Sequence, residues 1–285
     1  MNISELLLKG RKILDLKGVV NGKLDSLILL CHALSFSKEQ VIFNPELELN
    51  KDQEDGFLTL IDRRSNFEPV SHIIAKREFY GEEFIVNQDV LDPRPDTESL
   101  IELILKNIAR DKEMKILELG VGSGCISITL LKQYEFAKVV GVDISKAALK
   151  TCQNNIDKHQ VSKRIQLIES NLFTAIDAND KFDLIVSNPP YITSNDINYL
   201  APEVRIYEPK LALDGGVDGL DFYREIADKA HDFLNDGGEV LLEIGCGQHE
   251  DVIKIFLDKG FSLIESKCDL SSIIRVLYFG SKPRL

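Results

Sequence analysis

The sequence predicts an α/β protein in which a mostly parallel sheet, covered by helices on both faces, follows a small helical domain. From residue 92 onward, continuous apolar runs alternate with amphipathic segments, as in parallel strands that are buried on both faces. Residues 1–72 instead place apolar side chains three and four positions apart, which is typical of helices. The last two apolar runs, 261–270 and 272–280, have no helix between them. We therefore expect the final strand to be antiparallel.

The helical periodicity of the N-terminal region is carried by three segments, at residues 3–14, 24–34 and 52–67. We predict that residues 1–72 form a helical domain. Residues 73–91 contain two short strand-like runs around Gly81, which we interpret as a β-hairpin linker. Residues 92–285 then form the second domain.

The second domain alternates strands and helices from its first helix, for which Asp96 or Thr97 is the candidate cap. Before the final pair, strands are expected at 114–120, 138–144, 164–170, 182–188 and 238–245. Helices are expected between or after them at 125–134, 145–160, 219–234 and 248–260. In such a sheet the carboxyl ends of the parallel strands share one edge, which is where ligands bind.

Composition excludes several classes of function. The net charge is −12 without a basic patch, which disfavours general binding to nucleic acid. Five scattered cysteines without a C-x-x-C pair, and five dispersed histidines, indicate neither a disulfide framework nor a metal site. No apolar run is long enough to span a membrane, and charges interrupt the N-terminal apolar residues. We expect a cytoplasmic protein without a metal.

A glycine loop follows the first strand of the sheet, with Gly120, Gly122 and Gly124 in the stretch LELGVGSG. Glycines allow a sharp turn and a close approach to a ligand at a helix N-terminus. The next strand ends at Asp143, about 20 residues on, where a carboxylate can reach a ribose. Glu118 before the loop favours a ligand with an ammonium group over a pyrophosphate, so S-adenosylmethionine fits better than NAD. The alternative is a tight turn followed by a capping aspartate.

The stretch SNPPYIT ends the strand at 182–188. Pro189 and Pro190 have no N–H groups, so this backbone offers carbonyl acceptors but few donors. With the side-chain carbonyl of Asn188 it forms a fork of acceptors, which suits an NH₂ group whose nitrogen must be aimed at a methyl donor. Tyr191 adds a flat face for a planar amide or base. The alternative is a rigid turn with a buried tyrosine.

Several stretches together resemble the PrmC/HemK family of protein-(glutamine-N5) methyltransferases, which act on the Gly-Gly-Gln motif of class I peptide chain release factors. They are REFYGEEFIVNQDVLDPRPDTE, GVGSG, VSNPPYI, YEPKLALDGGVDGLDFYREI and LLEIG. The resemblance runs from about residue 5 to the C-terminus. It implies a Rossmann-like class I methyltransferase sheet, a substrate-recognising helical domain and S-adenosylmethionine as cofactor.

The resemblance also implies roles for individual residues. The cofactor would be held by Glu118, Gly120, Val121, Gly122, Ser123, Gly124, Asp143, Asn171, Leu172 and Asn188. Within this set the glycine loop would contact the methionine part, Asp143 the ribose, and Asn171 with Leu172 the adenine. Asn188, Pro189, Pro190 and Tyr191 would hold the glutamine amide as the catalytic residues. This chain has Asn171-Leu172 where the family commonly has Asp-Trp or Asp-Leu.

Other substrates stay open. A sister branch with N-P-P-Y modifies a glutamine of a ribosomal protein, and a third possibility is adenine N6 in DNA. The stretch at 94–98, RPDTE, resembles the release-factor branch, and the acidic charge argues against DNA. A non-catalytic nucleotide-binding module would have no use for N-P-P-Y.

Two charged stretches have undecided roles. The side chains of Glu203, Arg205, Tyr207 and Glu208 either shape the substrate pocket or belong to a solvated segment. Arg63 and Arg64 either contact an acidic partner or cap the helix that they end. No Ser-His-Asp or Cys-His arrangement is evident, and we expect no catalytic base, because the amide loses its proton after the transition state.

Overall fold

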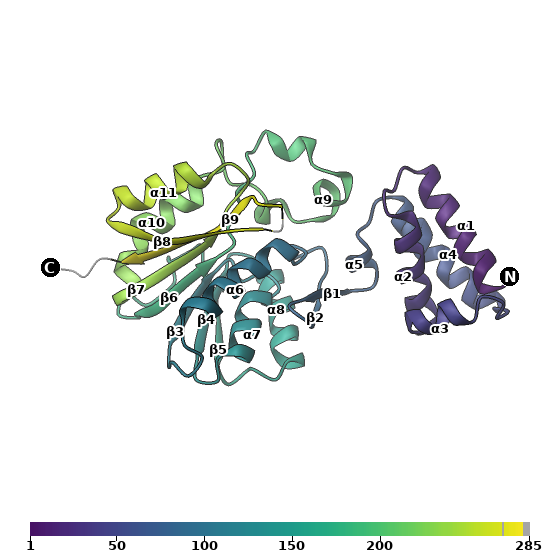
Figure 1. The fold of residues 1–285 in the computed structure, drawn as a ribbon, viewed down its shortest axis with the longest axis horizontal. Coiled ribbons are helices and arrows are strands. Elements are labelled where there is room, and N and C mark those ends of the chain that lie inside the picture. The colour runs from purple at the N-terminus through teal and green to yellow at the C-terminus, as the bar shows by residue number, and fades with distance from the viewer. Residues whose placement is uncertain (270, 282–285) are drawn as a thin grey trace. The chain divides into compact units, whose positions relative to one another are not determined.

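The computed structural model describes residues 1–269 and 271–281. It divides into two compact units (Figure 1). The helical unit comprises Met1–Lys76 together with Ala201–Tyr207. The sheet unit comprises Arg77–Leu200 and Glu208–Leu285. The segment 201–207 thus belongs to a different unit from the residues on either side of it.

The helical unit is built from α1 (Ile3–Leu16), α2 (Gly22–Leu34), α3 (Lys38–Phe43), α4 (Lys51–Ser65), α5 (Val70–Ile73) and α9 (Pro202–Tyr207). Its first, third and fourth helices begin with capping boxes, in which the N-cap residue and the third helical residue each accept, through the side chain, from the other's backbone N–H. Its core contains Leu6, Leu29 and Phe57, all fully buried. Each long helix therefore buries the face on which its apolar residues recur.

Close packing and one buried ion pair characterise the interior of this unit. Gly10 in α1 lies so near Phe57 in α4 that an added Cβ would be 2.6 Å from the ring. Arg64 Nε donates to Asp25 Oδ2 at 2.7 Å, and both side chains are almost fully buried. The guanidinium of Arg64 also pairs with Glu203 at 2.9 Å, which ties α9 to α4.

A two-stranded hairpin, β1 (Lys76–Phe79) and β2 (Glu82–Ile85), belongs to the sheet unit except for its first residue, Lys76. Its turn contains Tyr80 and Gly81, both with positive φ. The main sheet has seven strands in the order β5-β4-β3-β6-β7-β9-β8. They are β3 (Lys115–Leu119), β4 (Lys138–Asp143), β5 (Ile165–Glu169), β6 (Phe182–Ser187), β7 (Leu234–Glu243), β8 (Phe261–Cys268) and β9 (Ile274–Ser281).

Strands β3 to β7 are parallel, and β9 is antiparallel to both β7 and β8. The prediction of a mostly parallel sheet with an antiparallel last strand is therefore confirmed. In the register of the central pair, Leu119 lies beside Ser187, so the loops after β3 and β6 leave the sheet side by side.

Helices cover both faces of the sheet (Figure 1). One face carries α6 (Glu98–Asn107), α7 (Cys125–Gln133) and α8 (Lys146–Lys158), and the other carries α10 (Asp221–Phe233) and α11 (His249–Asp258). Successive residues of a strand pack against opposite helix layers: Ile116 packs with α6, α7 and α8, and Leu117 packs with α10 and α11. The described residues of this unit also form short 3-10 helices at Pro95–Thr97, Asp196–Tyr199 and Lys210–Ala212.

Thr97, one of the two predicted caps, occupies the N-cap position of the first helix of this unit but does not cap it with its side chain. Helix α6 begins at Glu98, and Thr97 forms no side-chain cap bond to it. A 3-10 turn, Pro95–Thr97, runs directly into the helix, so the residue before α6 already has helical dihedral angles and its hydroxyl is free for another partner. That partner is Asn188, described below.

Candidate active site

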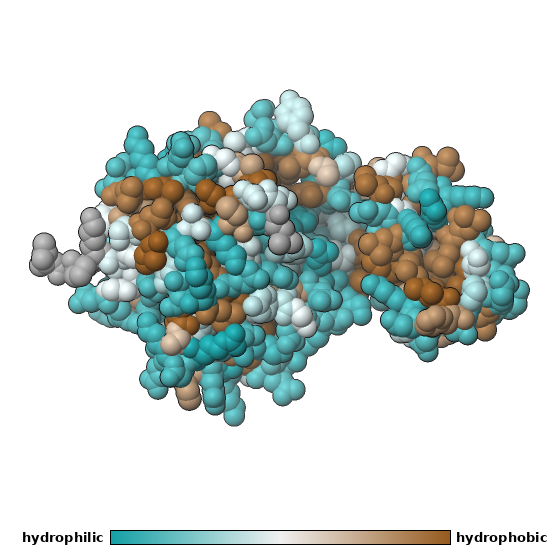
Figure 2. All heavy atoms as spheres, in the orientation of Figure 1, coloured by the Kyte–Doolittle hydropathy of each residue, from teal (hydrophilic) through white to brown (hydrophobic). Residues whose placement is uncertain are grey.

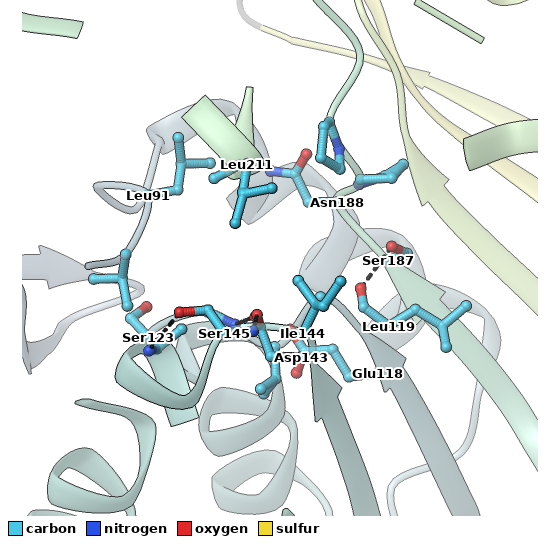
Figure 3. A pocket seen from close by; sticks show the side chains of 18 of the residues that line it. Leu91, Glu118, Leu119, Ser123, Asp143, Ile144, Ser145, Ser187, Asn188 and Leu211 are labelled. Atoms are coloured by element: carbon cyan, nitrogen blue, oxygen red, sulfur yellow. Dashed lines mark hydrogen bonds between the residues drawn. The ribbon is translucent and has the colours of Figure 1, made fainter. Parts of the chain in front are cut away.

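The site lies at the carboxyl ends of the central strands. Strand β3 pairs with β4 on one side and β6 on the other, so the connections leave in opposite directions and open a crevice between them. A cavity of about 190 Å³ occupies this position. In Figure 3, Asn188 and Leu211 lie across the cavity from Ser123, Asp143 and Ser145.

Most residues selected from the sequence line this one cavity. They are Glu118, Gly120, Val121, Gly122, Ser123, Asp143, Asn171, Leu172, Asn188, Pro189 and Pro190. Gly124 and Tyr191 are not on its wall. The cavity therefore joins the glycine loop, the end of β4 and the N-P-P stretch, which the sequence separates by up to about 70 residues.

The glycine loop takes its shape from its backbone. Gly120, Gly122 and Gly124 all have positive φ, a region that costs other residues conformational energy. The N–H groups of Gly120 and Val121 both donate to Val142 O at 2.9 Å. At Gly124 a Cβ would lie 2.7 Å from the sulfur of Cys152, so this glycine shapes the loop from behind rather than lining the cavity.

Asp143 is held by two backbone donors. Its Oδ2 accepts from Gly122 N and its Oδ1 from Ser145 N, each at 2.9 Å. Burial raises the pKa of Asp143, and the backbone hydrogen bonds oppose the shift. The carboxylate thus fixes the glycine loop to the end of β4 while lining the cavity.

Glu118 is 1% exposed and lines the same cavity. Its Oε2 accepts from the backbone N–H of Ser127 at 2.9 Å and from the Ser127 hydroxyl. Burial raises the pKa of Glu118 to about 8, with the charge of Asp143 adding to the shift. Two carboxyl groups on one wall make this part of the cavity suited to a cationic group.

A side chain that the sequence reasoning missed supports the loop from outside. Asn155 in α8 is fully buried. Its Nδ2 donates to Ser123 O and Ile85 O at 2.9 Å, and its Oδ1 accepts from Ile85 N at 2.7 Å. Asn155 therefore connects the glycine loop, α8 and the hairpin.

Asn188 presents its amide in a defined orientation. Its Nδ2 donates to Thr97 Oγ1 at 3.2 Å, which leaves Oδ1 as the acceptor available to a ligand in the cavity. The N-P-P stretch is braced from behind, because a Cβ on Gly215 would lie 2.8 Å from Pro190 O. The observed geometry is therefore compatible with the prediction that the side-chain oxygen of Asn188 accepts a hydrogen bond from a ligand.

Tyr191 points away from the cavity wall. Its hydroxyl lies 3.5 Å from Glu243 Oε1, and its backbone carbonyl accepts from Gln248 Nε2 at 3.0 Å. Burial raises the pKa of the Tyr191 hydroxyl far above its usual value. Its stacking on a substrate amide stays a prediction.

The cavity wall also includes Leu91, Arg94, Leu211 and Phe222. They lie in two of the stretches that resemble the family, but none of them was predicted as a site residue. Arg94 Nη2 pairs with Glu208 Oε2 at 2.7 Å, and the carboxylate of Glu208 is buried. The two residues of this ion pair are over 100 positions apart in the sequence, so no local sequence pattern predicts that they meet.

The two charged stretches left undecided have partners within the structure. Arg63 Nε donates to Glu68 at 2.8 Å, and Arg64 forms the buried pair with Asp25. In the 201–207 segment, Tyr207 donates its hydroxyl to Asn66 O at 2.9 Å. Neither stretch lines the cavity.

Within residues 1–269 and 271–281, no group of three or more His, Cys, Asp or Glu side chains is placed to hold a metal ion. The helices formed by these same residues include none that is long and apolar enough to cross a bilayer.

Two family models match the chain: PrmC N-terminal domain over residues 5–74 and Methyltransferase small domain over residues 94–216. The release factor glutamine methyltransferase of Geobacter sulfurreducens is 41% identical over 94% of this chain and 95% of its own length. The bifunctional methyltransferase of Rickettsia bellii is 39% identical over 97% of this chain, which spans about half, 54%, of that longer protein.

A solved structure gives the same fold. The 16S rRNA N2 G1207 methyltransferase of Thermus thermophilus, determined with AdoMet and guanosine, has a TM-score of 0.51 at 18% identity, over 73% of this chain and 52% of its own. At this identity the likeness concerns the fold alone. The sequence relatives extend over both units, and the chain belongs to the release factor glutamine methyltransferase family.

Proposed function

We propose that the protein transfers a methyl group from S-adenosylmethionine to the side-chain amide nitrogen, N5, of the glutamine in the Gly-Gly-Gln motif of class I peptide chain release factors. The observation that carries the proposal is the orientation of Asn188, whose Nδ2 is engaged by Thr97 and whose Oδ1 is left to accept. The family relationship supports the same substrate.

The donor set of the cavity fits this cofactor. Glu118 and Asp143 offer acidic groups near the glycine loop for a ligand that carries an ammonium and a sulfonium. The loop leaves room for close approach: a Cβ on Gly120 would meet nothing within 4 Å, and one on Gly122 would be 4.0 Å from its nearest neighbour, Gly120 O. Asn171 and Leu172 complete the wall, and we assign them to the adenine. When bound, the cofactor supplies an electrophilic methyl group.

The chain's own residues would bind and orient the glutamine amide. The Asn188 Oδ1 and the carbonyls of the following prolines accept the two amide hydrogens, which favours a pyramidal nitrogen with a localised lone pair. An amide is a poor nucleophile because that lone pair is delocalised, so orientation and fixed dipoles supply the main gain in rate. The nitrogen loses one proton to solvent after the transfer.

We assign substrate recognition to the helical unit. Apolar side chains gather on its visible face in Figure 2, over α1 and α2. A shallow pocket there is bordered by exposed apolar residues, including Leu8, Val20, Leu24 and Ile42. Exposed apolar area of this kind is characteristic of protein-binding surfaces. With a release factor as partner, the protein would work in the cytoplasm, without membrane or nucleic acid.

The test is to incubate the protein with labelled S-adenosylmethionine and, separately, release factors, ribosomal proteins and DNA. We expect label only in the release factors, and peptide mass spectrometry should place one added methyl on the Gly-Gly-Gln glutamine. A release factor with that glutamine replaced by alanine is the matched control. Label in ribosomal protein or in DNA adenine would instead establish one of the alternative substrates.

A further inference from the structure

A buried carboxyl group lies behind the amide-binding side chain. Glu243 ends β7, and its neighbour Leu242 pairs with Ser187, the residue before Asn188. The side chain is 1% exposed and does not line the cavity. Its Oε1 lies 3.5 Å from the Tyr191 hydroxyl, while its Oε2 has no hydrogen-bond partner of ordinary geometry in the described part of the chain. A buried oxygen without a partner costs stability, so it calls for an explanation.

Thr97 connects this carboxyl group with Asn188. Its hydroxyl accepts from Asn188 Nδ2 at 3.2 Å and is almost fully buried. A hydroxyl that accepts one hydrogen bond keeps its own hydrogen available to donate to a second group. Glu243 is the candidate acceptor, because its buried Oε2 has no other hydrogen-bond partner in the described part of the chain. In agreement with this, Thr97 is the strongest influence that lowers the pKa of Glu243.

We infer that Glu243 is a positioning residue which, through the Thr97 hydroxyl, sets the orientation of the Asn188 amide toward the substrate. The inference rests on the proposed function. With Glu243 ionised, Thr97 donates to the carboxylate and accepts from Asn188 Nδ2, so Oδ1 faces the substrate NH₂. With Glu243 protonated, the carboxyl can donate to Thr97, which then donates to Asn188 Oδ1. The amide would turn and present its own NH₂, which cannot accept the substrate's hydrogens.

The groups around Glu243 bring its pKa into a pH range in which its protonation can be followed. Burial, the largest influence, and the charge of Asp96 raise the pKa of Glu243 to about 7, while Arg275, Thr97 and Asn188 lower it. Arg275 is itself bound to Asp269 at 2.8 Å and lies 3.6 Å from Asp96.

The other titratable groups near the carboxyl group stay neutral near neutral pH. They are Tyr191, Tyr223 and Cys125, and burial raises the pKa of each. The active, ionised form of Glu243 therefore predominates above about pH 7 and is lost as the pH falls through that value.

The first test needs no methyl acceptor. The protein is labelled with ¹³C at the glutamate carboxyl carbons and with ¹⁵N at the asparagine side chains, and is titrated by NMR from about pH 5 to 9. Signals are assigned with Glu243→Gln and Asn188→Asp. We expect the Glu243 carboxyl and the Asn188 amide to shift with a common midpoint, and the Asn188 shift to disappear in Glu243→Gln. An Asn188 amide that does not respond to the titration of Glu243 would overturn the inference.

The second test is kinetic, with a release factor as methyl acceptor. In Glu243→Gln we expect kcat to fall by about 10- to 100-fold, the acid limb of its pH profile to vanish, and the Kd for S-adenosylmethionine to stay unchanged. The matched control is Glu239→Gln, at a partly exposed position on the same strand, which should keep the wild-type profile. Equal losses of cofactor binding and turnover would show a structural role and overturn the inference.

Thr97 provides the decisive comparison. Thr97→Ser keeps the hydroxyl and should keep turnover, whereas Thr97→Val should lower kcat about as much as Glu243→Gln does. The double variant Thr97→Val/Glu243→Gln should be no slower than either single variant, since both break one chain of hydrogen bonds. Additive losses would contradict the relay. If the wild-type protein methylates no release factor, the proposed function fails, while the NMR titration still decides the inference.

Discussion

In the proposed reaction the geometry of amide binding depends on Asn188, because its side-chain oxygen is left free to accept when Nδ2 donates to Thr97. In Asn188→Ala we expect methyl transfer to fall by about 10²- to 10³-fold, the loss typical of one preorganised polar partner in a transition state. The Kd for S-adenosylhomocysteine, measured by calorimetry, should hardly change.

Tyr191→Phe is the milder comparison for that variant, since the Tyr191 hydroxyl makes only a long contact of 3.5 Å to Glu243. If Asn188→Ala lost cofactor affinity and turnover in proportion, Asn188 would belong to the cofactor pocket instead of the amide site.

Glu118 makes the stability of the protein depend on pH. Folding raises its pKa from 4.5 to about 8 by burial, so the unfolded chain releases this proton at lower pH than the folded one. The corresponding stability is present below about pH 4.5 and is lost as the pH rises through about 8. We expect the cofactor-free wild-type protein to lose stability relative to Glu118→Gln between about pH 5 and 8.

Urea unfolding at a series of pH values would measure that difference. Glutamine can still accept from Ser127, so the variant keeps the hydrogen bond while removing the charge. A residual slope of the same sign is expected in Glu118→Gln, because the pKa of Glu243 is also raised, to about 7. Parallel curves for the two proteins would contradict the assignment of a buried, ionising Glu118.

Among the elements, α1 and α4 show how a glycine can have opposite roles in two helices of one unit. Gly10 in α1 permits close packing, since its Cβ would be 2.6 Å from the Phe57 ring. Gly56 in α4 has no heavy atom within 4 Å of such a Cβ. The first glycine is required by the packing, and the second only weakens its helix.

Alanine at these two positions should therefore shift stability in opposite directions. Gly56→Ala should raise the free energy of unfolding by about 1 kcal/mol through helix propensity. Gly10→Ala should lower it by about 1 to 3 kcal/mol, since the overpacked ring must move. Thermal unfolding of both variants measures the change, and a stabilised Gly10→Ala would mean that α1 and α4 can separate without cost.

At the scale of the whole molecule, the proposed recognition of the substrate by the helical unit can be tested with surface substitutions in each unit. Val20 in the helical unit is 94% exposed beside the apolar pocket. If this surface binds the substrate protein, Val20→Ser should raise the KM for a release factor severalfold, by the order of 1 kcal/mol for a buried apolar side chain. The kcat and the cofactor Kd should stay the same.

The comparison variant is Leu257→Ser on α11, where the side chain is half exposed in the sheet unit. It removes a similar apolar group from the other unit and should leave the KM unchanged. Equal changes in both variants would argue against recognition by the helical unit.

The sequence by itself determined the architecture, because periodicity and strand-end motifs are local properties of the chain. It identified the parallel sheet, its antiparallel last strand and both loops that meet at the cavity. The tertiary structure decided which polar groups join there: Thr97 binds Asn188 instead of capping α6, Arg94 pairs with Glu208, and Glu243 lies buried behind them. These partners come from segments far apart in the chain, and a hydrogen bond between such segments is fixed only when the elements around them pack together.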